Sequence, residues 1–548
     1  MISIQYPKSD NRILAGCLAI TAAALLPFAN KAFHIDDPYY IWVAQHIVDH
    51  PFDYYGLSIN WYGRPLPVYE MHVSPPFVPY YLAVWGSLFG WSEFALHIAF
   101  LPFALLFVGA TQALAQRFSR SSLLAVLLTV LSPLFLVTAT NIMLDLPMSA
   151  FFVAAIAAWC KGIDERHRGY LAIGALFTGL SALCKYFGVA ALPLFWVYAI
   201  ARRENVWRWA PYYTIPFALF AGEQTATYML YGRSLFINAV DIAATASNPT
   251  IFRIATALSF TGGCMVGALA FAWHMRPRRN CAAVYSLLAM LTGICATIVM
   301  ALNPSEDGLP ALSLLQLFVF TLGGVIVLVL ASADIYKKRS ADSALLFCWV
   351  LGTFAFAALM NWSVTARTLL PLAPPTAILI ARRIDALYEN AARFRRSFAV
   401  PLTACAAISF ACGAADYAWA RSIRDTARAF VAEAKRQTTS TYFQGHWGWQ
   451  YYLQQGGLAP LDVTKATFRP GDFVLSPQNN VNVEQIPARN AAEVTTTEVP
   501  TSKGLAVMSH QLGAGYYTDL FGPLPFAFGT RQTDVYHAIL LTFKKYNK

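Results

Sequence analysis

The segment Phe33-His34-Ile35-Asp36-Asp37-Pro38-Tyr39-Tyr40 places two adjacent carboxylates directly after the first apolar run, Leu14 to Ala29. Carboxylates at the edge of a bilayer cost free energy unless they are paired, hydrated or used, so this pair is a candidate for function. A second acidic point, Asp145, stands alone in a short connection between two apolar segments. If both connections face the same side, the carboxylates converge at one membrane surface. That arrangement suits a membrane enzyme that handles a lipid-borne substrate.

The composition around this segment predicts a protein with many membrane spans. The chain has 548 residues, of which 57% are hydrophobic and 13% charged; the charged share is about half that of a soluble domain. Apolar runs of about 18 residues or more recur along most of the chain, and we expect the first to remain as an uncleaved helix. The nine cysteines lie in or at the ends of these runs, which argues against a disulfide framework and a cysteine metal site.

The distribution of positive charge predicts the topology. Basic residues gather in alternate connections between the apolar runs, at 117–120, 161–168, 202–208, 276–279, 337–339 and 382–396. Under the positive-inside rule these connections face the cytoplasm. The excess of 40 Lys+Arg over 29 Asp+Glu therefore indicates orientation, and nucleic acid is not expected as a partner. The count of spans predicts about 13 transmembrane helices, with the N-terminus inside and the C-terminus outside.

Residues 76–90 form an apolar stretch that complicates the count. If they crossed the membrane, Arg117 and every later basic cluster would fall outside, against the charge rule. We therefore predict a short helix that lies in the membrane interface, with Tyr80, Tyr81 and Trp85 at the depth of the lipid headgroups.

The sequence divides into two domains at about residue 419, where a mixed polar composition begins. Residues 1–418 are predicted to form an all-α polytopic membrane domain with a long first outer loop, 31–93. Residues 419–548 are predicted to form a small extracytoplasmic α/β domain. We expect it to start with a helix over 420–437 and to contain strands at 473–476 and 538–543.

Three carboxylates, Asp36, Asp37 and Asp145, are the candidate catalytic residues. A general base must lie within hydrogen-bond reach of the hydroxyl that it activates, and partial burial tunes its pKa for that task. Asp36 and Asp37 are neighbours and therefore point to different faces, so one can act on substrate while the other holds a metal or caps the helix that starts at Pro38. The alternative interpretation is that each of the three carboxylates only caps a helix.

The first outer loop also offers a metal ligand. His72 is followed by Ser74-Pro75-Pro76 and is a candidate to bind a metal with Asp37 and Asp145, or to contact phosphate. A divalent metal ion is the one cofactor considered. The alternative is that His72 is a solvated or structural loop histidine.

Three cations run against the positive-inside trend because they fall on the predicted outer face: Lys185, Arg367 and Arg64. A cation at the membrane boundary needs an anion, and the anion available there is a lipid phosphate. The alternative is that these side chains reach the headgroups without any catalytic role. Glu223 is an intramembrane carboxylate that helix–helix hydrogen bonding explains as well as function does.

With these residues in view, the chain resembles the GT-C class of integral membrane glycosyltransferases. Within that class it looks closest to the bacterial branch with the lipid A aminoarabinose transferase and relatives of the protein O-mannosyltransferases. The resemblance rests on Asp36–Tyr40, Pro75–Pro76 with Leu88–Gly90, Leu144–Met148, Leu183–Gly188, Arg367–Pro371 and Gly445–Tyr452. Asp37 departs from the glutamate common in the family, and Ser74 stands about where the aminoarabinose transferase has a lysine, so that sugar is not implied.

The resemblance implies an inverting glycosyltransferase that moves a hexose or pentose from a polyprenyl-phosphate donor to a hydroxyl. The acceptor would be a lipid, a glycan or a protein at the outer face. It implies Asp36 as the base and Asp145 as the second essential carboxylate. It also implies a bacterial inner membrane location with the C-terminal domain in the periplasm, and membrane lipids as partners.

Two other functions compete with this interpretation. A transporter or flippase for a lipid or anion would also explain interfacial cations, although the long titratable first loop and the outer domain speak against it. A polysaccharide ligase or polymerase would share the donor type.

Overall fold

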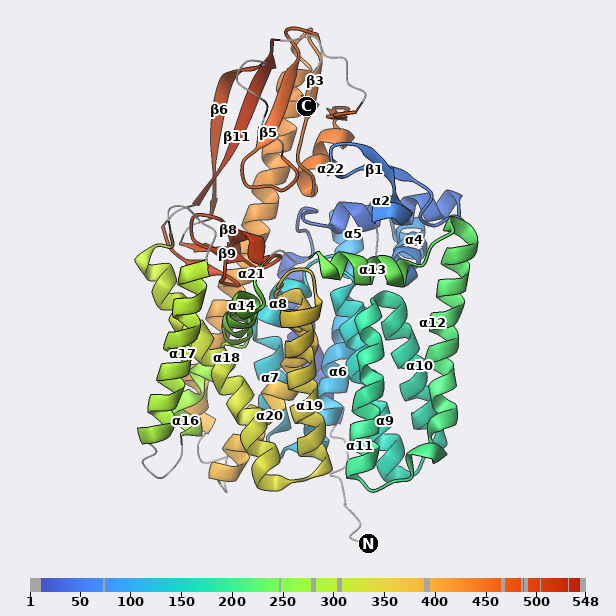
Figure 1. Ribbon diagram of the computed structural model, residues 1–548, viewed down its shortest axis with the longest axis vertical. Coiled ribbons are helices and arrows are strands. Elements are labelled where there is room, and N and C mark those ends of the chain that lie inside the picture. The colour runs from blue at the N-terminus through green and yellow to red at the C-terminus, as the bar shows by residue number, and fades with distance from the viewer. Residues whose placement is uncertain are drawn as a thin grey trace.

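The computed structural model describes residues 11–542, apart from 72–73, 246–247, 277–281, 303–307, 389–394, 465–468, 484–485, 487–490, 503 and 531. Figure 1 shows a helical bundle with a strand-containing region at one end, which we call the outer end. The opposite end is called the inner end. The long helix α21 (Arg395–Ala434) runs through the bundle and joins the two parts.

The bundle is built from apolar helices. They are α1 (Asn11–Leu25), α6 (Leu101–Phe118), α7 (Ser122–Val130), α8 (Pro133–Thr138), α9 (Asp145–Glu165), α10 (Arg168–Cys184), α11 (Ala191–Ala201), α12 (Ala210–Tyr231), α14 (Thr250–Cys264), α15 (Gly267–Ala270), α16 (Ala272–Met275), α17 (Ala282–Leu302), α18 (Ala311–Lys338), α19 (Ala341–Ala355), α20 (Ala373–Leu387) and α21.

Six helical segments among the described residues are long and apolar enough to cross a membrane. They are Asn11–Phe28, Glu93–Phe118, Asp145–Glu165, Ala311–Lys338, Ala341–Met360 and Ser397–Ala434. With the membrane class thus supported, the finer count of about 13 spans stays a prediction.

Small residues let two of these helices approach closely. A Cβ atom on Gly262 of α14 would lie 1.9 Å from the carbonyl oxygen of Phe320, and one on Gly324 of α18 would lie 2.1 Å from that of Leu258. Such contacts are the usual means by which helices associate where lipid surrounds them, because packing replaces the hydrophobic driving force.

Short helices cover the outer end of the bundle. They are α2 (Asp37–Asp49), α3 (Val68–Met71), α4 (Phe77–Phe89), α5 (Glu93–Ile98) and α13 (Leu235–Ala244). Helix α4 falls on the stretch predicted to be interfacial. Its 13 residues rise about 20 Å, too little for a hydrocarbon core of about 30 Å, and it packs on α2 at this end (Figure 1).

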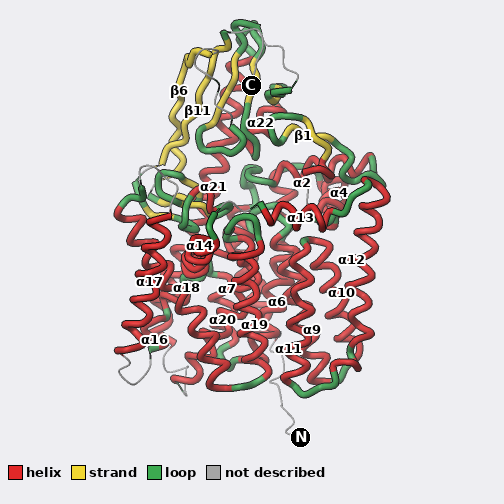
Figure 2. The backbone as a smooth tube through the Cα atoms, in the orientation of Figure 1, coloured by secondary structure: helices red, strands yellow, loops and turns green. Residues whose placement is uncertain are grey.

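The C-terminal region contains a five-stranded sheet in the order β4-β3-β5-β11-β6. Its elements are β3 (Thr441–Phe443), α22 (Gly448–Gln455), β4 (Ala459–Pro460), β5 (Phe473–Pro477), β6 (Ala491–Ser502) and β11 (Gln532–Leu541). Strand β3 is parallel to β4 and β5, whereas β11 is antiparallel to β5 and β6. Figure 2 shows these strands beside the outer part of α21. The strand expected at 473–476 is confirmed, and the last strand begins earlier than expected.

The predicted boundary between residues 418 and 419 falls inside α21. The two parts are therefore connected by one continuous helix, where the sequence had suggested a new helix from residue 420. Smaller strand pairs complete the outer region: β1 (Ser58–Asn60) with β2 (Pro65–Pro67), β7 (Leu505–Ala506) with β10 (Ala527–Phe528), and β8 (Met508–Ser509) with β9 (Ala514–Gly515).

Ion pairs tie the helix ends together at the inner end. Asp164, near the end of α9, pairs with Arg117 of α6 and with Arg202, which follows α11. Arg202 also reaches Asp342 at the start of α19, at 2.9 Å. Connections that the charge rule assigned to one side of the membrane thus lie together at one end of the bundle.

Candidate functional site

Four predicted residues form a row of alternating charges at the outer end. Arg367 Nη1 lies 2.9 Å from Asp36 Oδ2, and Arg367 Nε lies 3.9 Å from Asp145 Oδ2. Asp145 Oδ1 accepts a hydrogen bond from Lys185 Nζ at 2.8 Å. We call Asp36, Arg367, Asp145 and Lys185 the charge row. Residues from four separate parts of the sequence thus meet at the outer end.

Each member of the charge row stands at the end of a helix. Asp36 precedes α2, Asp145 is the first residue of α9, Lys185 joins α10 to the 3₁₀ helix η2 (Tyr186–Ala190), and Arg367 opens the 3₁₀ helix η5 (Arg367–Leu372). The helix ends therefore fix the positions of these four side chains at the outer end of the bundle.

The capping interpretation does not describe Asp36. Asp36 occupies the N-cap position of α2, yet its side chain makes no hydrogen bond to the helix. Its carboxylate turns to Arg367 and keeps 27% of its surface exposed, against 3% for Asp145. Asp36 is therefore the more accessible of the two carboxylates in the charge row.

The backbone before Asp36 is strained. Ile35 has a φ of 48°, a left-handed conformation that is unfavourable for a β-branched residue and costs about 1–3 kcal/mol. The neighbouring backbone is held by two hydrogen bonds, from Phe33 N to the Tyr452 hydroxyl and from His34 N to Asp37 Oδ2. Strain of this kind persists where the surroundings fix the chain, and it is common at functional sites.

Asp37 has a different role from its neighbour. Its side chain is fully buried, Oδ1 accepts from the backbone N–H of Ile142, and Oδ2 accepts from His34. Burial alone would raise the pKa of Asp37, but the hydrogen bond and charge of His34 outweigh it, and the pKa is lowered. Asp37 therefore ties the first outer loop to the turn before Asp145.

The described candidates do not fit a metal ion. Both oxygens of Asp37 are occupied by N–H donors, and the carboxylate of Asp145 lies between two cations. His72 lies outside the described residues. Within the described chain, no group of three or more His, Cys, Asp or Glu side chains is arranged to hold a metal.

Arg64 is not part of the charge row. It is exposed in the turn between β1 and β2, and none of the ion pairs among the described residues includes it. Tyr62, in the same turn, lies close enough to Asp36 for the two to interact electrostatically. The turn that carries Arg64 therefore borders the charge row.

Sequence analysis missed two neighbours of the charge row. Met143 Sδ lies 2.7 Å from Arg367 Nη1. Tyr40, on the first turn of α2, is buried beside Asp36, Arg367 and Asp145; burial first and the charge of Asp36 second raise the pKa of its phenol. Tyr40 therefore stays protonated as a possible hydrogen-bond donor. The repeated tyrosines after Pro38 were the available signal.

A second cluster consists of fully buried side chains, and its member His34 contacts Asp37, the neighbour of Asp36. Lys31 Nζ pairs with Asp416 of α21 at 2.5 Å, and His34 Nε2 lies 3.1 Å from the same carboxylate. Lys31 also donates to Asn141 Oδ1 at 2.7 Å. An outward cation and a carboxylate inside an apolar run are the signals that singled out Lys185 and Glu223, and they apply equally to Lys31 and Asp416.

Glu223 belongs to a hydrogen-bonded group next to Lys185. The Tyr186 hydroxyl lies 3.4 Å from both Glu223 carboxylate oxygens, and Gln224 Nε2 donates to that hydroxyl at 2.9 Å. Gln224 Oε1 in turn accepts from Ser234 Oγ at 2.5 Å. These contacts join α12 to η2 and agree with the helix–helix interpretation.

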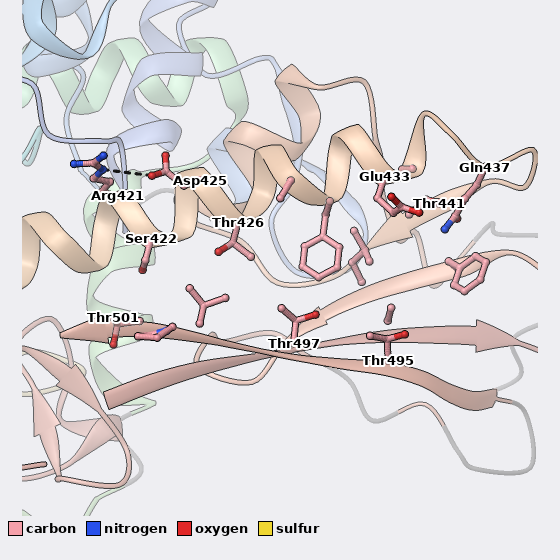
Figure 3. Close-up of a pocket in the computed structure, with 18 of the residues that line it drawn as sticks. Arg421, Ser422, Asp425, Thr426, Glu433, Gln437, Thr441, Thr495, Thr497 and Thr501 are labelled. Atoms are coloured by element: carbon pink, nitrogen blue, oxygen red, sulfur yellow. Dashed lines mark hydrogen bonds and ion pairs between the residues drawn. The ribbon is translucent and has the colours of Figure 1, made fainter. Parts of the chain in front are cut away.

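A cavity of about 890 Å³ lies apart from the charge row, between α21 and the sheet. In Figure 3, Thr426 of α21 faces Thr497 of β6 across it, and an ion pair between Arg421 and Asp425 stands at one end. None of its lining residues belongs to the charge row. The cavity is therefore separate from the charged site.

Comparisons with known proteins bear on the fold and on part of the site. Residues 73–222, which include Asp145 and Lys185, match the family model described as dolichyl-phosphate-mannose-protein mannosyltransferase. No curated protein sequence matches the chain.

Solved structures supply the remaining similarities. The oligosaccharyltransferase of Archaeoglobus fulgidus in its apo form aligns with a TM-score of 0.51 and 14% identity, over 83% of this chain and 65% of that one. ArnT from Cupriavidus metallidurans bound to undecaprenyl phosphate aligns with a TM-score of 0.43 and 16% identity, over 85% and 93%. The family match and the archaeal fold confirm the resemblance to the GT-C membrane glycosyltransferases.

Proposed function

We propose that this chain, which has the fold of a GT-C membrane glycosyltransferase, transfers a sugar from a polyprenyl-phosphate donor to an acceptor hydroxyl with inversion. The observation that carries the proposal is the charge row. It combines a partly exposed carboxylate with two cations on a membrane face where cations are scarce. The acceptor is a lipid, a glycan or a protein. We place the enzyme in a bacterial inner membrane, with the charge row and the sheet on the periplasmic side.

Lys185 and Arg367 are the proposed ligands of the donor phosphate. In the donor, the phosphate links sugar and lipid as a diester, and it gains a negative charge when the sugar leaves. Fixed cations beside that charge lower the barrier, since they favour the transition state over the ground state. Arg367 Nε is buried and has no hydrogen-bond partner among the described residues, so this donor is available for a phosphate oxygen.

Asp36 is the proposed general base. It removes the proton of the acceptor hydroxyl while the oxygen forms a bond to the anomeric carbon on the face opposite the phosphate. The bond between that carbon and the phosphate oxygen breaks, and its electron pair stays on the phosphate. Because Arg367 contacts Asp36 at 2.9 Å, an arriving phosphate competes for the guanidinium and releases the carboxylate to act as a base.

The proposed reaction uses the protein's own cations in place of a metal ion. We propose that the two cations supply the neutralising charge that a divalent metal supplies in other sites. The support is the pairing of Asp145 with Lys185 and Arg367, and the occupation of both Asp37 oxygens. Asp145 then serves to hold the two cations at the spacing that a phosphate requires.

Radiolabelled undecaprenyl-phosphate sugars, each carrying one hexose or pentose, test the proposal with the purified protein in liposomes. The expected result is release of free undecaprenyl phosphate and movement of the label to an acceptor in a membrane extract. Label that crosses the bilayer with its sugar–phosphate bond intact would instead identify a flippase and overturn the proposal.

A further inference from the structure

The loop that carries Arg367 has little secondary structure of its own. Residues 361–366 lie between the π-helical turn Phe356–Met360 and η5, and they form neither helix nor strand. A segment without helix or strand bonds of its own depends on contacts with its surroundings, and residues 363–366 are buried against other parts of the molecule. A guanidinium that must stay within 3 Å of a carboxylate on another segment therefore needs support from outside its own loop.

That support comes from the C-terminal region. Ala366 N donates to the carbonyl of Tyr516 at 2.8 Å, and Asp519 N donates to the carbonyl of Val364 at 2.9 Å. Val364 N donates to Asp519 Oδ1 at 3.1 Å. We call residues 516–519, Tyr-Tyr-Thr-Asp, the junction strip. Two backbone hydrogen bonds and one bond to the Asp519 side chain thus join it to the Arg367 loop.

The carboxylate of Asp519 is fixed in turn. Asn248 Nδ2 donates to Asp519 Oδ2 at 3.3 Å. Arg253 of α14 donates to the carbonyl of Asn361. Its positive charge also interacts electrostatically with the carboxylate of Asp519. The Arg367 loop is thus held on one side by α14 and on the other by the junction strip.

Tyr517 of the junction strip contacts the buried cluster that holds the first outer loop. The Tyr517 hydroxyl lies 2.9 Å from Asp416 Oδ2 and 3.3 Å from His34 Nε2. His34 Nδ1 faces Asp37, the neighbour of Asp36. A single hydroxyl from the C-terminal region therefore completes the buried cluster that fixes the position of the proposed base.

The same segment also reaches the turn that carries Asp145. The Tyr516 hydroxyl lies 2.8 Å from Thr138 Oγ1 at the end of α8. The amide of Asn141 donates to the Tyr517 hydroxyl at 2.9 Å. Three loops that bring Asp36, Asp145 and Arg367 together thus meet on two adjacent tyrosines and one aspartate, all of them buried.

We propose that the junction strip positions the charge row, and that Tyr517 and Asp519 are positioning residues for sugar transfer. The C-terminal region then completes the reaction site by inserting this strip between the membrane loops. The inference rests on the proposed function, because it assigns a purpose to the spacing of Asp36 and Arg367. Small displacements matter here, since misplacement by about 1 Å can cost about 10²-fold in rate.

Tyr517→Phe is the main test, with Tyr198→Phe as its matched control. Tyr198 is also fully buried, and its hydroxyl lies 2.8 Å from a carboxylate, Asp164, at the inner end. Both changes remove one hydroxyl from an aspartate whose side chain is little exposed, 0% for Asp416 and 9% for Asp164. Similar losses of thermal stability are therefore expected for the full-length variants in detergent, whereas only Tyr517→Phe displaces the charge row.

Turnover with a radiolabelled undecaprenyl-phosphate sugar separates position from stability. We expect Tyr517→Phe to lower kcat by about 10-fold or more at an unchanged KM for the donor, and Tyr198→Phe to leave kcat at the wild-type value. Asp519→Ala acts on the loop of Arg367, a proposed ligand of the donor phosphate, and should lower kcat and also raise the KM for the donor. Wild-type kcat in both junction-strip variants, or an equal loss in Tyr198→Phe, would overturn the proposal.

Hydrogen exchange supplies a readout that is independent of sugar transfer. Asp519→Ala should speed exchange at Val364, whose N–H loses its acceptor, and Tyr517→Phe should speed exchange over 33–37. Tyr198→Phe should change neither segment. If the wild-type protein cleaves no donor, the proposed function fails while faster exchange still supports positioning. Unchanged exchange in both variants would reject positioning even in an active enzyme.

Discussion

The two ends of the helical bundle use the same residue types in different ways. At the inner end, Asp164 accepts from Arg202, from the Tyr198 hydroxyl and from Arg117, and the side chains of Asp164 and Arg117 are each 9% exposed. At the outer end, Asp36 is 27% exposed and meets a single cation.

The difference separates a structural network from the site to which we assign anion binding. Asp164 pairs with two arginines and also accepts from a tyrosine hydroxyl, whereas Asp36 pairs with one cation and has a more exposed side chain. Arg367 Nε lies 3.9 Å from Asp145 Oδ2, which is too far for a hydrogen bond. The inner network stabilises helix ends, and the outer row is the group that the proposed function assigns to a phosphate.

The largest expected effect separates Asp36 from the carboxylates of the inner end. Asp36→Asn keeps the size of the side chain but removes the base, so we expect turnover to fall by about 10²-fold or more with little change in thermal stability. Turnover of a radiolabelled undecaprenyl-phosphate sugar, measured beside thermal unfolding, checks this. If the variant keeps most of its turnover, the base must be sought elsewhere in the first outer loop.

The next effect concerns the two outer cations. Lys185→Gln and Arg367→Gln should each weaken binding of undecaprenyl phosphate by about 10- to 100-fold, the value of a hydrogen bond to a charged group. Arg367→Lys should rescue binding only in part, because lysine lacks the planar fork of donors. Titration of the purified protein with undecaprenyl phosphate measures the affinity. Unchanged affinity in both Gln variants would show that these residues do not bind the donor phosphate and would favour the alternative, in which they only contact lipid headgroups.

At the inner end the expected loss is in stability. Arg382 is buried and pairs with Asp334 at 3.1 Å, so Arg382→Gln leaves that carboxylate with Lys338 as its cation. Breaking a buried pair costs up to about 3 kcal/mol, and thermal unfolding should shift to lower temperature. Donor turnover per folded molecule should stay at the wild-type level. If Arg382→Gln lost turnover and kept the wild-type thermal stability, the assignment of a purely structural role to the inner end would be wrong.

The smallest effect depends on pH and lies in the sheet. Burial raises the pKa of Asp534 to about 6, while its carboxylate accepts only from the neutral groups of Trp419 and Asn479 among the described residues. The folded state therefore retains a proton that the unfolded state has lost between about pH 4 and pH 6, and stability falls as the pH rises through that window. Asp534→Asn should flatten this slope, measured as the difference in thermal unfolding between the two proteins.

Sequence reasoning predicted the elements of the fold better than their boundaries. The short outer helix α4 followed from charge, because a crossing there would have inverted the rest of the chain. The boundary at residue 418 was drawn where the composition turns polar, but α21 continues through it to Ala434. A helix that leaves a membrane changes its surroundings without changing its backbone, so composition alone marks the water surface and misses the continuity.

For the site, the sequence identified the residues but not their partners. Asp36, Asp145, Lys185 and Arg367 were recognisable because charge beside an apolar run is costly. The separation of roles between Asp36 and Asp37 depends on the direction of each side chain, which adjacent identical letters do not reveal. Tyr517 carried no signal, because a tyrosine in a mixed polar region is ordinary until its hydroxyl is seen to meet Asp416.

Helix α21 gives the molecule a fixed height. Its 40 residues make a rod of about 60 Å, about twice the thickness of the hydrocarbon core. One half is anchored among the other helices, and the other half carries the sheet. The helix therefore fixes the distance between the inner end of the bundle and the sheet. Under the proposed function, this distance selects acceptors by how far their hydroxyl lies from the bilayer as well as by their chemistry.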